Sequence, residues 1–234
     1  MATDRIAPIQ QELKLEAARR ALDLVKSGMT VGLGSGSTAT LWIELLGEQV
    51  RKGKLNIRAI ASSPDSETLG RSFGIPFVTF DDCPRLDLTV DGADEIAPGL
   101  ALIKGGGGKL LREKIVAGAS ERFVIIADQS KIADVLGGAP LPVEVIPMTV
   151  PLVTPVLRGL GFATTKIRTK KDRSPYITDQ GNLLVDCSGM KIDDPAKIAD
   201  ELDRMVGVVE HGLFLKMANL AIIATKDGVI ERSQ

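Results

Sequence analysis

The first half of the chain alternates between two hydrophobic patterns, one with the period of a helix and one typical of a buried strand. Residues 11–26 place apolar side chains at helical spacing, and Gly28 follows as a stop signal. The predicted strands are 29–33, 57–61, 77–80, 86–90, 100–103 and 123–127, and the predicted helices are 11–26, a segment through residues 41–46, and 109–119. Strands that are apolar along their length and alternate with helices indicate a mainly parallel α/β sheet with flanking helices.

The pattern changes near Pro140. The predicted elements after it are strands at 143–146 and 165–169 around a helix, strands at 176–178 and 182–186 around a hairpin turn, and a helix from Pro195. Residues 213–231 return to a strand pattern. We therefore expect residues 1–139 and 208–234 to form a Rossmann-like catalytic α/β domain, with residues 140–207 inserted as a smaller α+β domain.

Composition and charge exclude several classes of function. The 234 residues have a net charge of −1 and only 3% aromatic side chains, so neither a nucleic-acid surface nor a base-stacking platform is expected. The charged N-terminal segment lacks the apolar core of a signal peptide, and no apolar stretch is long enough to span a membrane. We expect a cytoplasmic protein in which Cys83 and Cys187 are reduced thiols. The single histidine, His211, is interpreted as structural, and no metal site is expected.

The segment TVGLGSGSTAT, residues 30–40, is the first of three loops that suggest chemistry. A strand runs into small residues and then into a helix, where free N–H groups, the helix dipole and hydroxyls favour a phosphate. The alternative is a tight turn capped by Ser37 or Thr38. A dinucleotide site is disfavoured because the next predicted strand ends without an acid, and Asp65 lies beyond a proline.

The second loop is VDGADEI, residues 90–96. A predicted strand delivers Asp91, Gly92 allows a sharp turn, and Asp94 and Glu95 follow. Such closely spaced carboxylates suit metal binding, sugar-hydroxyl binding or proton transfer. The alternative is an acidic surface turn in which Asp94 caps a helix.

The third loop is KGGGGKLLREK, residues 104–114. Lys104 follows an apolar run, so its ammonium is expected at the carboxyl edge of a strand. The four glycines present backbone N–H groups that can stabilise a developing oxyanion. Glu113 lies just over one turn into the following helix, where it is either a functional carboxylate or the exposed partner of Lys109 at i, i+4 spacing. A phosphate loop, acids, an ammonium and N–H donors together suit aldose–ketose isomerisation of a sugar phosphate.

The motifs GLGSGSTA, DGADEI, KGGGGKLLREKI, ADQSK and LPVEVIP, in this order, resemble those of the ribose-5-phosphate isomerase A family over essentially the whole chain. The resemblance implies interconversion of D-ribose 5-phosphate and D-ribulose 5-phosphate in the pentose phosphate pathway, without metal or organic cofactor. It also implies a homodimer or homotetramer, and we expect its contacts in residues 140–207.

The resemblance implies a role for each matching residue. The implied catalytic residues are Glu113, Asp91, Asp94 and Lys104. Glu113 matches the base that moves a proton between C1 and C2, and Asp91 matches the acid implicated in ring opening. The implied substrate-binding residues are Ser35, Gly36, Ser37, Thr38, Asp91, Gly92, Ala93, Asp94, Lys104, Gly105, Gly106, Gly107, Lys131 and Lys14. Among them, Lys104 and the glycines match the segment that steadies the enediolate, while Lys131 and Lys14 match lysines near the phosphate.

Two positions depart from the family pattern. Ser35 stands where many members have threonine, and Lys109 stands where a small residue is common.

Three other functions are disfavoured by the sequence. A non-catalytic sugar-phosphate sensor would carry a DNA-binding helix pair ahead of the phosphate loop, where this chain has a single predicted helix. A coenzyme A transferase needs a nucleophilic glutamate, and a nucleotide-dependent reductase needs the missing strand-end acid.

Overall fold

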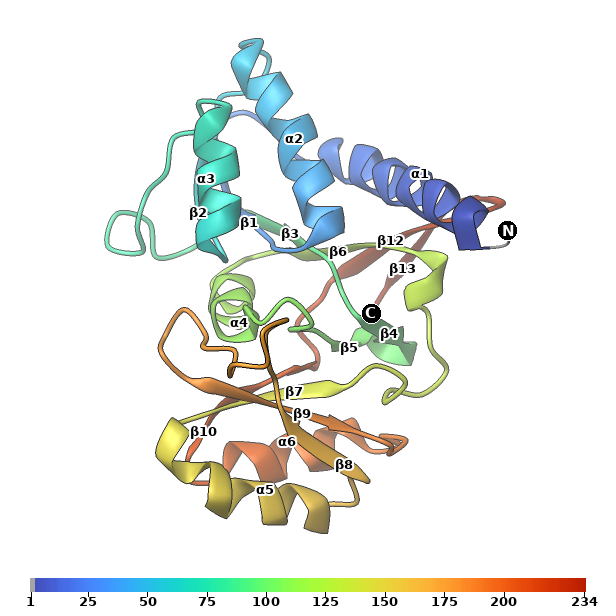
Figure 1. Cartoon of the computed structure of the whole chain (residues 1–234). Coiled ribbons are helices and arrows are strands. Elements are labelled where there is room, and N and C mark those ends of the chain that lie inside the picture. The colour runs from blue at the N-terminus through green and yellow to red at the C-terminus, as the bar shows by residue number, and fades with distance from the viewer. Residues whose placement is uncertain (1–2) are drawn as a thin grey trace. The chain divides into compact units, whose positions relative to one another are not determined.

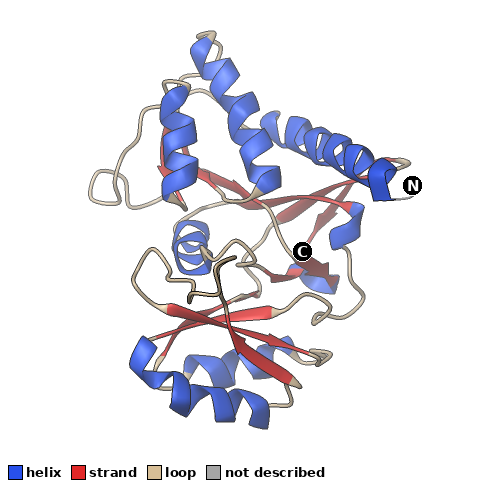
Figure 2. Ribbon diagram, in the orientation of Figure 1, coloured by secondary structure: helices blue, strands red, loops and turns tan. Residues whose placement is uncertain are grey.

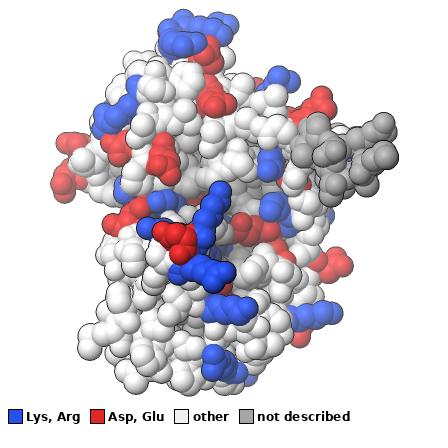
Figure 3. Space-filling model, viewed as in Figure 1, with Lys and Arg blue, Asp and Glu red and all other residues white. Residues whose placement is uncertain are grey.

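The computed structural model describes residues 3–234, with side chains described from residue 9 onward. The chain forms two compact units. The first contains the described residues up to Ala93, Arg112–Lys131 and Lys216–Gln234, and the second contains Asp94–Leu111 and Ile132–Leu215. Within the described residues, no helix has the length and apolar character needed to cross a membrane. Charged side chains of both signs occur on the face shown in Figure 3, in keeping with the small net charge.

The first unit is built on a six-stranded sheet with the order β13-β12-β6-β3-β1-β2. Its strands are β1 (Thr30–Leu33), β2 (Arg58–Ala61), β3 (Leu88–Asp91), β6 (Phe123–Asp128), β12 (Leu220–Thr225) and β13 (Gly228–Ser233). All neighbouring strands are parallel except β12 and β13, which form an antiparallel pair. The predicted mainly parallel sheet is therefore confirmed.

Helices cover this sheet on both faces. They are α1 (Thr3–Leu22), α2 (Ser37–Arg51), α3 (Pro64–Ser72) and α4 (Leu110–Gly118), of which α4 begins with two residues of the second unit. Helices α1, α2 and α3 lie on one face, while α4 lies on the other (Figure 1). Strands β1, β3 and β6 are buried along their whole length because both faces are covered, which explains their unbroken apolar sequences.

The second unit contains two antiparallel sheets, with the orders β10-β7-β9-β8 and β11-β5-β4. Its strands are β4 (Glu95–Ala97), β5 (Ala101–Ile103), β7 (Leu141–Val145), β8 (Thr164–Ile167), β9 (Leu183–Ser188), β10 (Val208–His211) and β11 (Leu213–Phe214). Helices α5 (Val150–Gly159) and α6 (Pro195–Asp203) lie along one face of the four-stranded sheet (Figure 2). Val143, Val185, Leu157 and Leu202 are part of the core between them.

Several predicted elements differ from those observed. The predicted strand at 77–80 is wrong, since only Phe77 forms an isolated bridge, to Ala59. Pro76 has no N–H to donate, and the N–H and C=O of Thr79 are engaged in a local turn with Asp82 and Cys83. The predicted strand at 176–178 is likewise reduced to one bridge, although the turn at 179–181 is present. Helix α3 and strand β4 were not predicted.

The compact units have other boundaries than the predicted domains. Residues 94–111, 132–139 and 208–215 group with the second unit rather than with the first. The boundary therefore passes through two of the motifs, between Ala93 and Asp94 and between Leu111 and Arg112. The assignment of a catalytic domain and an inserted domain concerns function and stays a prediction.

Candidate active site

The loop after β1 has the geometry of an anion site. Gly34 lies so close to β3 that a Cβ there would stand 2.6 Å from the Asp91 Cα, so only glycine fits. Gly36, with φ of 90°, is the N-cap of α2 and has no side chain to occupy the N–H groups of the first turn. These N–H groups and the hydroxyls of Ser37 and Thr38 therefore remain for a ligand. The alternative of a turn capped by Ser37 or Thr38 is wrong.

Lys14 reaches this loop from α1. Its Nζ donates to Ser37 Oγ at 3.0 Å. The contact places the Lys14 ammonium beside the N-terminus of α2. The positive charge of the ammonium and the positive end of the helix dipole both favour an anion there. Lys14 was assigned from a short motif, and the structure brings it to the predicted phosphate loop.

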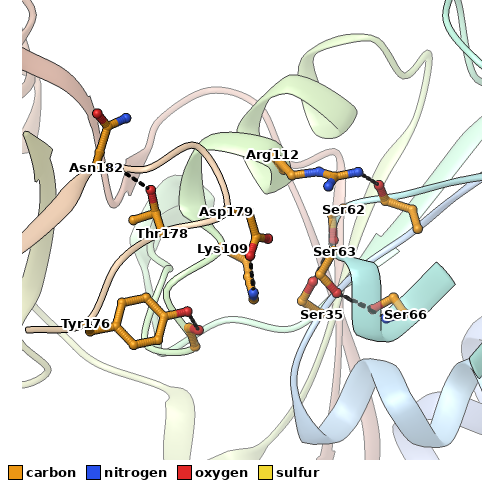
Figure 4. A network of polar contacts seen from close by, with 12 residues as sticks. Ser35, Ser62, Ser63, Ser66, Lys109, Arg112, Tyr176, Thr178, Asp179 and Asn182 are labelled. Atoms are coloured by element: carbon orange, nitrogen blue, oxygen red, sulfur yellow. Dashed lines mark hydrogen bonds and ion pairs between the residues drawn. The ribbon is translucent and has the colours of Figure 1, made fainter. Parts of the chain in front are cut away.

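Three buried serines after β2, Ser62, Ser63 and Ser66, are hydrogen-bonded to the same loop or to one another (Figure 4). Ser35 and Ser62 share a hydrogen bond between their hydroxyls at 2.7 Å. Ser66 Oγ donates to the carbonyl of Gly34 at 2.6 Å and accepts from Ser63 Oγ at 2.9 Å. Ser62, Ser63 and Ser66 were missed by the sequence analysis; three serines directly around Pro64, after a buried strand, were the available signal.

Asp91 is buried at the end of β3, with 1% of its surface exposed. Its Oδ1 accepts the backbone N–H of Ser35 at 2.9 Å and that of Gly92 at 2.7 Å. The same sheet edge carries Lys131, because β6 is parallel to β3 and leads into the short turn Gln129–Lys131. The first unit thus brings the predicted phosphate loop, Asp91 and Lys131 to one edge of its sheet.

The other two carboxylates of the acidic motif belong to the second unit. Asp94 is no helix cap, since β4 follows it, and its Oδ2 accepts the N–H of Gly106 at 2.7 Å. Glu95 accepts the N–H groups of Gly137 at 2.8 Å and Ala139 at 2.7 Å. Glu95 is therefore a structural anchor for that turn, and the interpretation as an acidic surface turn is wrong because Asp91 and Glu95 are both buried.

Lys104 follows β5 and is only 3% exposed. Its N–H donates to the carbonyl of Gly212 at 2.9 Å, and its Nζ lies 5.4 Å from the centroid of the Phe214 ring. An aromatic face attracts an ammonium, and it excludes water from one side of it. The lysine is thus held in a partly apolar setting directly before the glycines.

The four glycines meet different local requirements. Gly105 and Gly108 have φ of 96° and 80°, and the N–H of Gly108 donates to the carbonyl of Gly105 at 2.9 Å. A Cβ on Gly106 would stand 2.6 Å from Asp94 Oδ1. A Cβ on Gly107 would have no neighbour within 4 Å. Three of the glycines are therefore required by backbone shape or close contact, whereas Gly107 borders open space.

Glu113 lies in the first turns of α4 and is 4% exposed. The alternative interpretation of Glu113 as an exposed residue is therefore wrong, and carboxylates are rarely buried without a partner or a specific role. In the second unit, Lys109 Nζ forms an ion pair with Asp179 Oδ1 at 2.7 Å. The ion pair gives Lys109 a partner that its spacing in the sequence did not indicate.

His211 belongs to a group with Asp203 and Glu210, the one set of metal-capable side chains found among the described residues. Its Nδ1 accepts the N–H of Leu213 at 3.2 Å, which leaves the ring proton on Nε2, 3.1 Å from Asp203 Oδ1. Nε2 then donates to the carboxylate instead of offering a lone pair to a cation. The geometry therefore suits a structural histidine better than a metal ligand.

Comparison with known proteins identifies the family. A model of ribose 5-phosphate isomerase A (phosphoriboisomerase A) matches residues 58–228. Ribose-5-phosphate isomerase A from Gluconobacter oxydans is 50% identical over 218 residues, which cover 92% of this chain and 94% of that protein.

Two solved structures have nearly the same fold. Ribose 5-phosphate isomerase A from Methanocaldococcus jannaschii superposes with a TM-score of 0.91 at 40% identity, covering 96% of this chain and 100% of that one. A D-ribose-5-phosphate isomerase in complex with phospho-erythronic acid gives a TM-score of 0.92 at 34% identity, covering 95% and 98% of the two chains. The chain belongs to the ribose 5-phosphate isomerase A family.

Proposed function

We propose that the chain interconverts D-ribose 5-phosphate and D-ribulose 5-phosphate by moving a proton between C1 and C2 through an enediolate. The observation that carries the proposal is the burial of Glu113 in the helix that begins directly after the glycine loop. In the sequence, the glycines that offer backbone N–H donors come shortly before this buried carboxylate. Such a combination suits proton abstraction beside a carbonyl. Membership of the family supports the choice of substrate.

The phosphate is assigned to the first unit. Ser35, Gly36, Ser37 and Thr38 offer N–H groups and hydroxyls at the N-terminus of α2. Lys14, which is hydrogen-bonded to Ser37, and Lys131 add positive charge. Hydrogen bonds from the buried Ser62 and Ser66 to this loop hold its donors in place before the substrate arrives.

Proton transfer is assigned to two carboxylates of the same unit. Glu113 takes a proton from one carbon of the substrate and returns it to the other. Asp91 assists ring opening, since the reaction needs the open-chain aldehyde. Both side chains are buried, which removes competing water and strengthens their interaction with a substrate.

The enediolate is assigned to Asp94, Lys104 and Gly105–Gly107, with Gly92 and Ala93 at the start of the acidic turn. Lys104 supplies a positive charge, and the glycines supply N–H donors, so that the charge developing on oxygen is stabilised. These residues follow directly in the chain on those of the first unit, at Ala93–Asp94 and at Leu111–Arg112.

The proposal is tested by following ribulose 5-phosphate formation from ribose 5-phosphate with a chelator present. We expect activity in the wild type and a fall of several orders of magnitude in Glu113→Gln, because the amide cannot accept the proton. Glu121→Gln, which changes an exposed acid shortly after the same helix, is the matched control and should keep full activity.

Each contrary outcome has a distinct meaning. Activity that survives in Glu113→Gln leaves the isomerase in place and moves the base to Asp91 or Asp94. Loss of wild-type activity on adding chelator contradicts metal-free catalysis. A wild type that binds ribose 5-phosphate without converting it favours the sugar-phosphate sensor.

A cytoplasmic homo-oligomer belongs to the same proposal. Four large apolar side chains are exposed near α5 and α6. Met148 lies just before α5, Leu152 and Val156 lie on it, and Val206 follows α6, with exposed fractions of 83%, 71%, 49% and 91%. Met148, Leu152 and Val156 follow one another at intervals of four residues, so they share one side of the helical segment. An apolar surface of this kind is typical of a contact between protein chains, and we assign it to a second copy of this chain.

A further inference from the structure

We propose that Arg168 is a positioning residue that sets the direction of the N–H groups in the glycine loop. The inference rests on the proposed isomerase function, in which this loop stabilises the enediolate. It concerns the second unit alone and assigns a role to a segment, residues 168–186, that neither the motifs nor the spacing of the sequence had linked to catalysis.

The guanidinium of Arg168 is engaged on two sides. Its Nη1 donates to the carbonyl oxygens of Gly105 and Gly106, at 3.0 Å each. Its Nε and Nη2 donate to the two carboxylate oxygens of Asp186 at 2.9 and 2.5 Å. The paired bonds to Asp186 fix the plane of the guanidinium, so Nη1 is held at the loop.

The same segment makes further contacts with the loop. Tyr176 Oη donates to the carbonyl of Gly107 at 3.3 Å, and Asp179 forms the ion pair with Lys109 (Figure 4). The carbonyls of three consecutive glycines thus accept hydrogen bonds from one segment. The Tyr176 ring also packs against Gly108, since a Cβ on Gly108 would stand 2.6 Å from Tyr176 Cε1.

These contacts determine where the N–H groups point. In a trans peptide the N–H lies opposite the carbonyl of the preceding residue. Holding the carbonyl of Gly105 therefore turns the N–H of Gly106 toward Asp94 Oδ2, which accepts it at 2.7 Å. Holding the carbonyl of Gly106 turns the N–H of Gly107 away from the guanidinium, and this N–H meets no acceptor among the described residues. Gly107 is exposed, with open space around it.

One guanidinium thus fixes two peptide planes, one that orients the carboxylate of Asp94 and one that presents the Gly107 N–H. Glycine peptides rotate readily, because no side chain restricts them. Without Arg168 we expect the loop to sample other orientations, with a loss of preorganisation at the oxyanion.

The contribution of Arg168 is geometric and not a matter of added charge. Its positive charge is paired with Asp186, and that of Lys109 is paired with Asp179. The Arg168–Asp186 pair therefore adds no net charge to the loop. A residue of this kind should change kcat, whereas substrate affinity, which depends mainly on the phosphate, should change little.

The test compares Arg168→Met, Arg168→Lys and Tyr176→Phe with the wild type, and Lys171→Met serves as a control on an exposed lysine of the same segment. We measure kcat and KM for ribose 5-phosphate, thermal unfolding, and inhibition by phospho-erythronic acid, whose carboxylate shares one negative charge between two oxygens and so resembles the enediolate. Arg168→Met should lower kcat by about 10²-fold, with KM nearly unchanged. Inhibition by phospho-erythronic acid should weaken in parallel with kcat.

The remaining variants decide the outcome if Arg168→Met does not fold. Arg168→Lys keeps a charge but cannot bind Asp186 and two carbonyls together, so we expect a smaller loss of kcat with wild-type KM. Tyr176→Phe removes one long hydrogen bond and should lower kcat by a few-fold. Wild-type kcat in a folded Arg168 variant overturns the inference while the isomerase stands. An inactive wild type overturns the proposed function itself.

Discussion

Asp91 Oδ1 accepts the backbone N–H of Ser35 at 2.9 Å, which ties the end of β3 to the loop after β1. The carboxylate predicted to act on the sugar is therefore also a support of the predicted phosphate loop. Glycine at position 34 allows this contact, since any Cβ there would stand 2.3 Å from the same oxygen.

The two roles of Asp91 can be separated by substitution. Asp91→Asn keeps an oxygen that accepts the Ser35 N–H but loses the charge, so kcat should fall by about 10²–10⁴-fold with little change in KM. Asp91→Ala removes both, so KM should rise as well. Steady-state kinetics with ribose 5-phosphate distinguish the two variants, and equal KM values would show that the Ser35 contact does not support phosphate binding.

The glycine loop offers a matched pair of substitutions. Gly108→Ala combines a φ of 80° with a Cβ 2.6 Å from the Tyr176 ring, so it should destabilise the protein by about 1–3 kcal/mol. The Cβ added in Gly107→Ala has no neighbour within 4 Å, so this variant should unfold at the same temperature as the wild type. Its methyl group narrows the space beside the Gly107 N–H, however, and should lower kcat.

Thermal unfolding and kinetics of both variants check this prediction. Wild-type kcat in Gly107→Ala would remove its N–H from the list of oxyanion donors. A stable Gly108→Ala would mean that the loop tolerates another conformation.

Much of the fold follows from the sequence, because continuous apolar runs leave few alternatives to buried parallel strands. The placement of the predicted phosphate loop beside Asp91 was predictable for the same reason, since parallel strands deliver their carboxyl ends to one edge. Arg168 was not predictable, because its acceptors are backbone carbonyls 62 and 63 residues away, and carbonyls leave no pattern in a sequence. The structural role of Glu95 was not predictable either, because its oxygens accept the backbone N–H groups of Gly137 and Ala139, which lie more than 40 residues away in the chain.

The two cysteines should react at very different rates. Burial raises the pKa of Cys187 to about 12, with a further contribution from the charge of Asp186. At pH 8 its thiolate fraction is then roughly one part in 10⁴, so iodoacetamide should modify the half-buried Cys83 and leave Cys187 intact in the folded protein.

The raised pKa of Cys187 also determines how its contribution to stability varies with pH. The folded state favours the protonated thiol, so this contribution is fully present below pH 9.0 and is lost as pH rises toward about 12. The difference in reactivity is checked by peptide mass spectrometry after iodoacetamide labelling, with and without urea, which shows whether Cys83 or Cys187 is modified. Rapid labelling of Cys187 without urea would contradict its burial.

The apolar side of α5 predicts an oligomer that a single charge should disrupt. Leu152 is 71% exposed, so replacing it with glutamate should leave the monomer folded while placing an unpaired charge in the contact between two copies. We expect light scattering after gel filtration to give a smaller mass for Leu152→Glu than for the wild type, with an unchanged far-ultraviolet circular dichroism spectrum. Ala196→Glu adds the same charge at an exposed position of α6 and should keep the wild-type mass. A wild type that is already monomeric, or a Leu152→Glu variant with the wild-type mass, would assign the oligomer contact to another surface or exclude it.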